Sequence, residues 1–160
     1  MFLCIWFTNF ENMALSASKS KVCFFNQDVT VSLRQRTSLK KFIAGIFRRE
    51  GRKLDALNYV FCTDRALLQI NQSFLKHDYY TDIITFDLSE GSGITAEIYI
   101  STDRVRENAR KLGVPFKSEL HRVIFHGALH LCGYKDKKPH QQQKMRERED
   151  YYLKLLGISI

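Results

Sequence analysis

The sequence is organised around residues 126–136, which read His126-Gly127-Ala128-Leu129-His130-Leu131-Cys132-Gly133-Tyr134-Lys135-Asp136. On an α-helix, side chains four residues apart share a face, with Cβ atoms about 6 Å apart, so His126 and His130 can point at one ion. Gly133 suits the left-handed position that ends a helix, and Asp136 then follows where the returning chain can supply an oxygen ligand. Two histidines and a carboxylate form a known catalytic zinc set, which leaves the fourth position to water.

The same spacing of two histidines, a glycine and a third ligand occurs in metzincin proteases. Gly127 stands where those enzymes carry their glutamate base, so a peptidase would lack its main catalytic group. A metal-dependent hydrolase of another substrate is a separate alternative. A further alternative is that the two histidines are merely paired core or surface residues. The glycine and the aspartate at these offsets favour the metal site.

This stretch resembles the signature of the YbeY family of bacterial metal-dependent endoribonucleases, His-Gly-x-Leu-His-x-x-Gly-Tyr-Asp-His. The chain matches it at six positions, His126, Gly127, Leu129, His130, Gly133 and Tyr134. The family pattern continues with Asp-His, whereas this sequence has Lys135-Asp136, so an aspartate replaces the usual third histidine. Because a carboxylate also binds zinc, we interpret the change as a substituted ligand. His140 is the alternative third ligand, although it lies four residues beyond Asp136 and Pro139 intervenes.

The composition narrows the class of protein. A chain of 160 residues is long enough for one domain that buries about two thirds of its unfolded surface without disulfides. The four cysteines show no Cys-x-x-Cys spacing, so we interpret them as free thiols of a cytoplasmic protein. The formal charge of +8 suits a polyanionic partner such as RNA. Since no run of 18 apolar residues occurs, no membrane span is predicted.

The first residues are interpreted separately from the rest. Residues 1–7 are apolar, but they form a short run without a basic leading region, and no small-residue cleavage site follows. Met13 comes directly after residue 12. We therefore expect residues 1–12 to be a non-native or disordered extension and residues 13–160 to form a single domain.

The remaining chain alternates strand and helix patterns. Strands are predicted at residues 22–26, resumed after a turn at 29–31, and at 58–62, 81–86 and 96–101. Helices are predicted after Thr37-Ser38 to Glu50, from the cap Asp64 to Phe74, after Ser101 or Thr102 to Leu112, from the cap Ser118 through the histidines, and from Pro139 to Leu156. This order predicts an α+β sandwich with one mixed sheet of about four strands and about five helices, in which the metal-binding helix is central.

The last two helices carry the packing pattern around the histidines. The core stripe of the first helix is Leu120, Val123, Ile124, Gly127, Ala128 and Leu131, and the adjoining stripe, which faces a cleft, is Arg122, His126, Leu129 and His130. Arg122 is expected to orient a ligand or contact a phosphate, with a surface ion pair as the alternative. In the last helix Met145, Tyr152 and Leu156 are expected to pack, and Glu147, Glu149 and Asp150 to be solvated.

A second block of the sequence, residues 81–86, is similar to the family's Pro-Thr-Asp/Asn-Val-Leu-Ser-Phe, which a loop arginine precedes. Aligning Thr81 with the threonine of that block puts Leu75 where the family's catalytic arginine stands. Lys76 is the nearest cation that can replace it, followed by Arg65 and His77. Lysine lacks the bidentate fork of arginine, and the alternative is an exposed loop lysine without a role.

The resemblance implies a cytoplasmic, single-strand-specific endoribonuclease that acts in maturation of the 16S rRNA 3′ end and in ribosome quality control. Its partners would be precursor 16S rRNA and the ribosome or small-subunit proteins, with no membrane contact. One Zn²⁺ per chain, held by His126, His130 and Asp136, would lower the pKa of a bound water to about 7. Lys76 and Arg122 complete the expected catalytic set. The alternative is a non-catalytic RNA-binding or ribosome-binding protein whose metal is structural, which four protein ligands would indicate.

Overall fold

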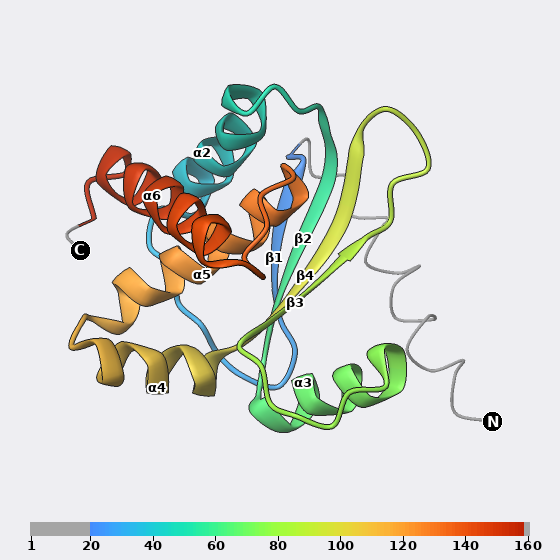
Figure 1. Cartoon of the computed structure of the whole chain (residues 1–160), viewed down its shortest axis with the longest axis vertical. Helices are drawn as coiled ribbons and strands as arrows, with labels where there is room; N and C mark the ends of the chain where they lie inside the picture. Colours follow the sequence, from blue (N-terminus) through green and yellow to red (C-terminus); the bar gives the residue numbers. More distant parts are fainter. Residues whose placement is uncertain (1–19, 159–160) are drawn as a thin grey trace.

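The computed structural model describes residues 20–158, so the extension predicted at residues 1–12 lies outside the described residues. The elements follow in the order β1 (Val22–Asn26), α2 (Arg36–Arg49), β2 (Leu54–Cys62), α3 (Asp64–Ile70), the π-helical turn η1 (Asn71–Leu75), β3 (Ile83–Asp87), β4 (Ile94–Ser101), α4 (Thr102–Leu112), α5 (Phe116–Leu131) and α6 (Pro139–Leu155) (Figure 1). No helix of this described part is long and apolar enough to cross a bilayer.

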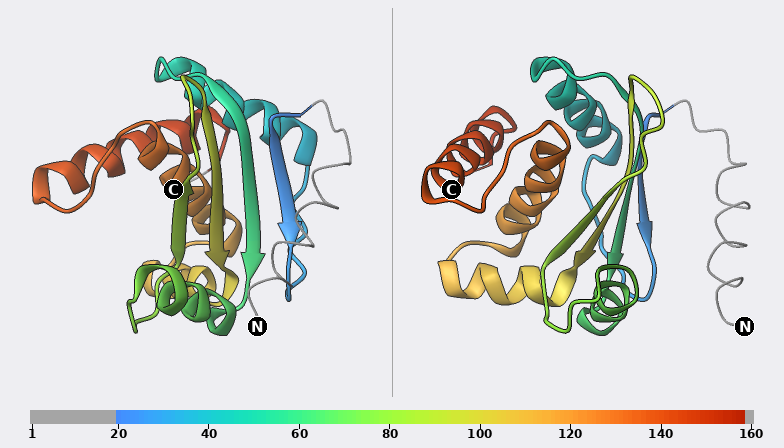
Figure 2. Two further views of the ribbon diagram at one scale, coloured as in Figure 1. Left: turned by 90° about the vertical axis from the view of Figure 1, so that its right-hand side faces the viewer. Right: turned by 45° about the vertical axis from the view of Figure 1, so that its right-hand side comes forward.

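The strands form one mixed sheet in the order β1-β2-β4-β3. β1, β2 and β4 are parallel, and β3 runs antiparallel to β4 at the edge. Helices α2, α4, α5 and α6 lie on one side of this sheet (Figure 2). The α+β class, the mixed four-stranded sheet and the five helices are confirmed for the described residues.

Alternation along the strands builds a core on each face of the sheet. Tyr59 and Ile98 belong to the large cluster beneath α2, α5 and α6, whereas Val60 and Tyr99 point the other way, into a smaller cluster with α3. In residues 96–101 the apolar Ile98 and Ile100 alternate with Glu97, Tyr99 and Ser101, which predicts a strand whose Tyr99 side is wet. That expectation is wrong, because α3 covers it and leaves Tyr99 only 8% exposed.

Helix α5 is buried on more sides than one stripe predicts. Leu129, which we expected to face the cleft beside the histidines, is fully buried, as is Phe125. Both lie in the core cluster to which α2 and α6 contribute Phe47 and Tyr152. The prediction of α5 as the central helix is correct, but Leu129 belongs to the core and does not line the cleft.

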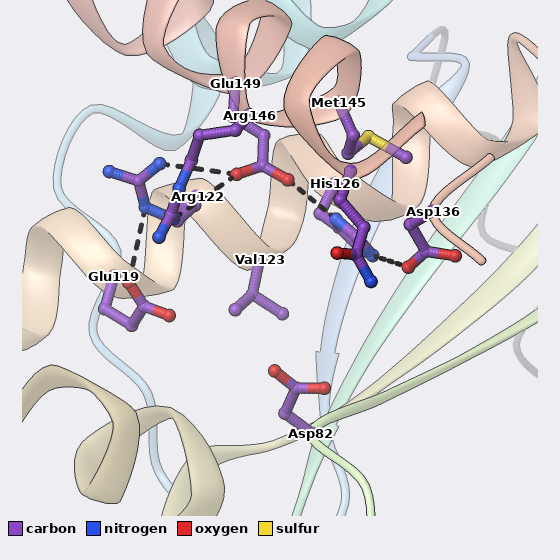
Figure 3. A pocket seen from close by; sticks show the side chains of 10 residues that line it. Asp82, Glu119, Arg122, Val123, His126, Asp136, Met145, Arg146 and Glu149 are labelled. Carbon is purple, nitrogen blue, oxygen red and sulfur yellow. Dashed lines mark hydrogen bonds and ion pairs between the residues drawn. The ribbon is translucent and has the colours of Figure 1, made fainter. Parts of the chain in front are cut away.

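Gly127 explains why α5 lies so close to the sheet. A Cβ atom at this position would meet Cδ1 of Ile83 at 2.8 Å and Cδ1 of Ile98 at 2.9 Å, which is closer than packed carbon atoms approach. Glycine therefore lets the helix contact β3 and β4 directly. His126, the preceding residue, is turned away from the sheet toward the cleft (Figure 3).

Several predicted element boundaries differ from the structure. The strand does not resume at residues 29–31, where Val29 and Val31 pack against the core from an irregular segment. Helix α2 begins at Arg36 after Gln35 in a left-handed conformation, so Thr37 and Ser38 lie inside the first turn. Thr37 and Ser38 have side chains that can cap a helix, but neither occupies the cap position because the helix begins before them.

Two further caps are shifted by tertiary structure. The α3 cap is Thr63, whose hydroxyl accepts a hydrogen bond from the Ala66 amide, so Asp64 is the first helical residue. Helix α5 begins at Phe116 after Pro115, and Ser118 lies within its first turn. The α4 prediction is correct at both ends, with Ser101 as the cap and Gly113 in the left-handed conformation.

Candidate metal centre

Three ligand atoms converge where α5 ends. Nε2 of His126 lies 2.9 Å from Nε2 of His130, and the two rings are nearly perpendicular, at 89°. Oδ2 of Asp136 lies 3.6 Å from the His126 nitrogen and 3.4 Å from the His130 nitrogen. Donors around a tetrahedral zinc ion with bonds of about 2.1 Å are separated by about 3.4 Å, so this set fits such an ion.

The turn after α5 brings Asp136 back to the histidines. Gly133 adopts φ 104°, a left-handed conformation that a side chain would strain. The Tyr134 amide donates to the carbonyl of Leu129 at 3.0 Å, and the Gly133 amide to that of His130 at 2.9 Å. These bonds cap the helix and reverse the chain, as the glycine predicted. Three residues later the carboxylate of Asp136 reaches the imidazoles.

The second nitrogen of each imidazole is held by an oxygen acceptor. Nδ1 of His126 lies 2.7 Å from Oε1 of Glu149, and Nδ1 of His130 lies 2.9 Å from the carbonyl oxygen of Tyr134. An ionised carboxylate and a carbonyl can only accept, so each Nδ1 carries the proton. In neutral rings the two Nε2 lone pairs then face each other beside a carboxylate. A cation between them relieves that repulsion, which is the usual arrangement of metal-binding histidines.

A buried ion cluster fixes Glu149. Oε2 of Glu149 accepts from Nη1 of Arg122 at 3.3 Å, and the same guanidinium donates to Asp150 at 2.7 Å and lies 3.4 Å from Glu119. Glu149 is only 5% exposed, so the expectation that it is solvated is wrong. Arg122 is buried as well, which rules out a surface ion pair. It stabilises the carboxylate that holds His126.

Burial and charge oppose each other at this site. Burial lowers the pKa of His126, but the hydrogen bond and charge of Glu149, with the charges of Asp136 and Asp82, outweigh it and raise that pKa. Burial raises the pKa of Glu119, an effect that Arg122 only partly offsets. The carboxylates around His126 therefore favour a positive charge at this site, as a bound cation would supply.

Clefts lie on both sides of the two histidines. On the His126 side, α5 and α6 enclose about 320 Å³ together with Asp82 and Asp136 (Figure 3). On the His130 side, a cleft of about 790 Å³ is lined by Arg52, Lys53 and the segment between β3 and β4. A ligand can thus approach the converging nitrogens from either side.

The other predicted residues lie apart from this centre. His140 is exposed on the first turn of α6 and lines a different cavity with Glu50 and Arg148. Among the described residues, the group whose ligand atoms converge contains Asp136 and not His140. Lys76 is exposed in a left-handed conformation at the end of η1 and lines neither cleft beside the histidines.

Glu149 and Arg146 line the His126 cleft, and the sequence interpretation missed both. A usable signal was present for Glu149. We predicted that Met145 and Tyr152 pack against the core. Glu149 lies four residues after Met145 and three before Tyr152, so it shares their face of α6. The neighbouring run of charged residues hid that pattern.

The chain has clear relatives. The sequence model of the family described as "Endoribonuclease YbeY" matches residues 22–157. A protein of that name from Cytophaga hutchinsonii is 49% identical over 135 residues, which cover 84% of this chain and 94% of the relative. One from Porphyromonas gingivalis is 44% identical over 141 residues, covering 88% and 93%.

A solved structure shares the fold. The solution structure of TM1509 from Thermotoga maritima matches with a TM-score of 0.57 at 28% sequence identity, over 82% of this chain and 86% of that one.

Proposed function

Because this chain belongs to the YbeY endoribonuclease family, we propose that it is a metal-dependent endoribonuclease that cleaves single-stranded RNA at the centre formed by His126, His130 and Asp136. The observation that carries the proposal is the convergence of these three ligand atoms between two clefts. Structural zinc sites are usually closed by four protein ligands, whereas catalytic sites keep a position for water or substrate. Three convergent ligands within the described residues favour catalysis over a structural metal.

We propose Zn²⁺ as the metal, one ion per chain. Two imidazoles and a carboxylate suit zinc, although imidazole also binds other divalent metals of the first transition row. When bound, such an ion supplies a Lewis acid and lowers the pKa of a coordinated water. No glutamate base on α5 is then required.

The residues around the ligands set their orientation. Glu149 and the Tyr134 carbonyl hold both Nδ1 protons, so each ring presents the lone pair of Nε2 to the centre. Arg122 holds Glu149 through an ion pair at 3.3 Å. In this scheme Arg122 acts through Glu149 as a positioning residue and does not contact substrate. The phosphate contact that we expected of Lys76 stays a prediction.

A peptidase is the weaker alternative. The α5 position that carries the base in zinc proteases is Gly127, which packs against Ile83 and Ile98 and has no room for a side chain. A side chain at this position of α5 would therefore face the sheet and not the cleft.

We further propose that the substrate is precursor 16S rRNA, cut at its 3′ end in the bacterial cytoplasm, with the ribosome or its small-subunit proteins as partners. The formal charge of +8 and the basic residues Arg52 and Lys53 beside His130 support an RNA substrate.

The proposal is tested by cleavage of a single-stranded precursor RNA with the native protein and with His126→Ala and His130→Ala. Both variants should lose cleavage and, by elemental analysis, most of the bound metal. His140→Ala is the matched control, because His140 is exposed on α6 outside the convergent group, and it should keep both properties. Undiminished cleavage in the two α5 variants would sink the proposal, and metal loss in His140→Ala would favour the structural alternative.

A further inference from the structure

One face of α6 closes the His126 cleft. Gln142, Met145, Arg146 and Glu149 recur at helical spacing along it and line the cleft together. Opposite them, α5 contributes Glu119, Arg122, Val123 and His126 (Figure 3). Asp82, the residue before β3, adds a side chain that points into the cleft from below (Figure 3).

The two arginines that line this cleft have different environments. The Arg122 side chain is 10% exposed and pairs with Glu119, Glu149 and Asp150. The Arg146 side chain is 51% exposed and makes an ion pair with Oε2 of Glu149 at 3.8 Å, a long distance for such a pair. Glu149 already accepts from His126 and Arg122, so it needs no third donor. The guanidinium of Arg146 is thus weakly held at the mouth of the cleft.

The carboxylates of the cleft repel an anionic ligand, and the guanidinium of Arg146 can offset that repulsion. Four carboxylates line the walls, on Asp82, Glu119, Asp136 and Glu149. Arg122 already pairs with Glu119, Glu149 and Asp150, and Asp136 belongs to the candidate metal site. A phosphate entering the cleft therefore requires a further positive group, and Arg146 is placed to supply it. A guanidinium binds two phosphate oxygens at once, with well-defined geometry.

Gln142 adds a neutral donor to the same spot. It lies one helical turn before Arg146 on the same face of α6, and its side-chain amide carries two N–H donors. The cleft volume of about 320 Å³ is at the small end of ligand sites and leaves room for a phosphodiester linkage.

We propose that Arg146, assisted by Gln142, forms an anion subsite on α6 that binds an RNA phosphate next to the metal centre. The inference rests on the proposed endoribonuclease function and deepens it, because it assigns a phosphate contact to a helix that carries none of the metal ligands. Arg146 contacts substrate in this scheme, whereas Arg122 positions Glu149.

Binding to metal-free protein tests the subsite without any cleavage. The protein is treated with a chelator, and its affinity for a fluorescent single-stranded RNA is measured at several KCl concentrations. Each phosphate contact adds about 0.7 to the slope of log affinity against log salt for a single strand. Arg146→Ala should lower that slope by about this amount. Arg110→Ala, which removes the same charge from the exposed end of α4, should leave the slope unchanged.

Cleavage by the metal-loaded protein gives the second readout. Arg146→Ala should lower kcat/KM by about 10- to 100-fold, the value of a charge-assisted contact, and Arg146→Lys should recover part of the loss because it keeps the charge without the fork. Both variants should keep the metal content and thermal stability of the native protein. An unchanged slope with unchanged kcat/KM overturns the subsite, as does a loss of activity that follows a loss of metal.

The two levels of proposal fail in different ways. If the native protein cleaves RNA and Arg146→Ala matches it in both kcat/KM and salt slope, the subsite is wrong and the function stands. If the native protein cleaves no RNA when loaded with metal, the function is wrong, and the salt dependence of the metal-free protein still decides whether Arg146 binds phosphate.

Discussion

Oε1 of Glu149 lies 2.7 Å from Nδ1 of His126, so a carboxylate on α6 holds the orientation of a candidate ligand on α5. The two residues are 23 positions apart in the sequence, and the contact exists only because the two helices pack together. Arg122 holds the other oxygen of the same carboxylate. The geometry of the centre therefore depends on the interface between the last two helices as much as on the histidines.

Replacing Glu149 by glutamine should weaken metal binding by about 10- to 100-fold, because the neutral amide no longer stabilises the Nδ1 proton of His126. Competition with a chromogenic chelator measures the affinity. Glu147→Gln is the matched control, since Glu147 is exposed on α6 and hydrogen bonds to Gln143. Equal metal affinity in the two variants would show that Glu149 does not support the centre.

Gly127→Ala should destabilise the fold by about 1–3 kcal/mol, since the added methyl group overlaps Ile83 and Ile98 in a packed core. Gly45→Ala is the control on α2. There the added Cβ would meet the end of the flexible Arg49 side chain at 2.8 Å, and alanine is the better helix former by up to about 1 kcal/mol. Urea unfolding should give opposite signs for the two changes. Two equal losses would contradict the close approach of α5 to the sheet.

Glu50 links α2 to the turn that holds His130. It accepts a hydrogen bond from the Tyr134 hydroxyl at 3.0 Å and pairs with Arg148 and Tyr152 of α6, while the Tyr134 carbonyl accepts from His130. Burial raises the pKa of Glu50, but the hydrogen bonds from Tyr152, Arg148 and Tyr134 outweigh this and hold its pKa below the ordinary 4.5. The charged form therefore stabilises the fold.

Glu50→Gln should lower the free energy of unfolding at pH 7 by about 1–3 kcal/mol. The folded pKa is the lower one, so this contribution is present above pH 4.5 and is lost as the pH falls through the folded value. Denaturant unfolding of both proteins at pH 7 and at successively lower pH should show the difference shrinking. A difference that stays constant through the acid range contradicts the pKa assignment.

The histidine block illustrates what local sequence can predict. The spacing of His126 and His130, the left-handed Gly133 and the return to Asp136 all follow from helix geometry and one glycine, and the structure brings these side chains together. The lengths of the strands, in contrast, are set by their neighbours in the sheet. Residues 54–57 and 94–95 extend β2 and β4 beyond the predicted runs because neighbouring strands pair with them, which no local pattern records.

The supporting residues were harder to predict because charge in a sequence is ambiguous. Glu149 and Asp150 lie in a run of alternating charges that usually marks a solvated helix face, yet Glu149 is buried against Arg122 and His126. The pairing depends on which face of α6 meets α5. Cap positions show the same effect, since Thr37 and Ser118 have suitable side chains but the chain enters the helix earlier.

The most direct test of the account is a calorimetric titration of the chelator-treated protein with Zn²⁺. The account predicts one site per chain in the native protein, and a stoichiometry near zero in the double variant His126→Ala/His130→Ala. Asp136→Ala should still bind, but more weakly, because two imidazoles remain. Unchanged zinc binding in the double variant, or no binding by the native protein, would contradict the claim that these side chains form the metal centre.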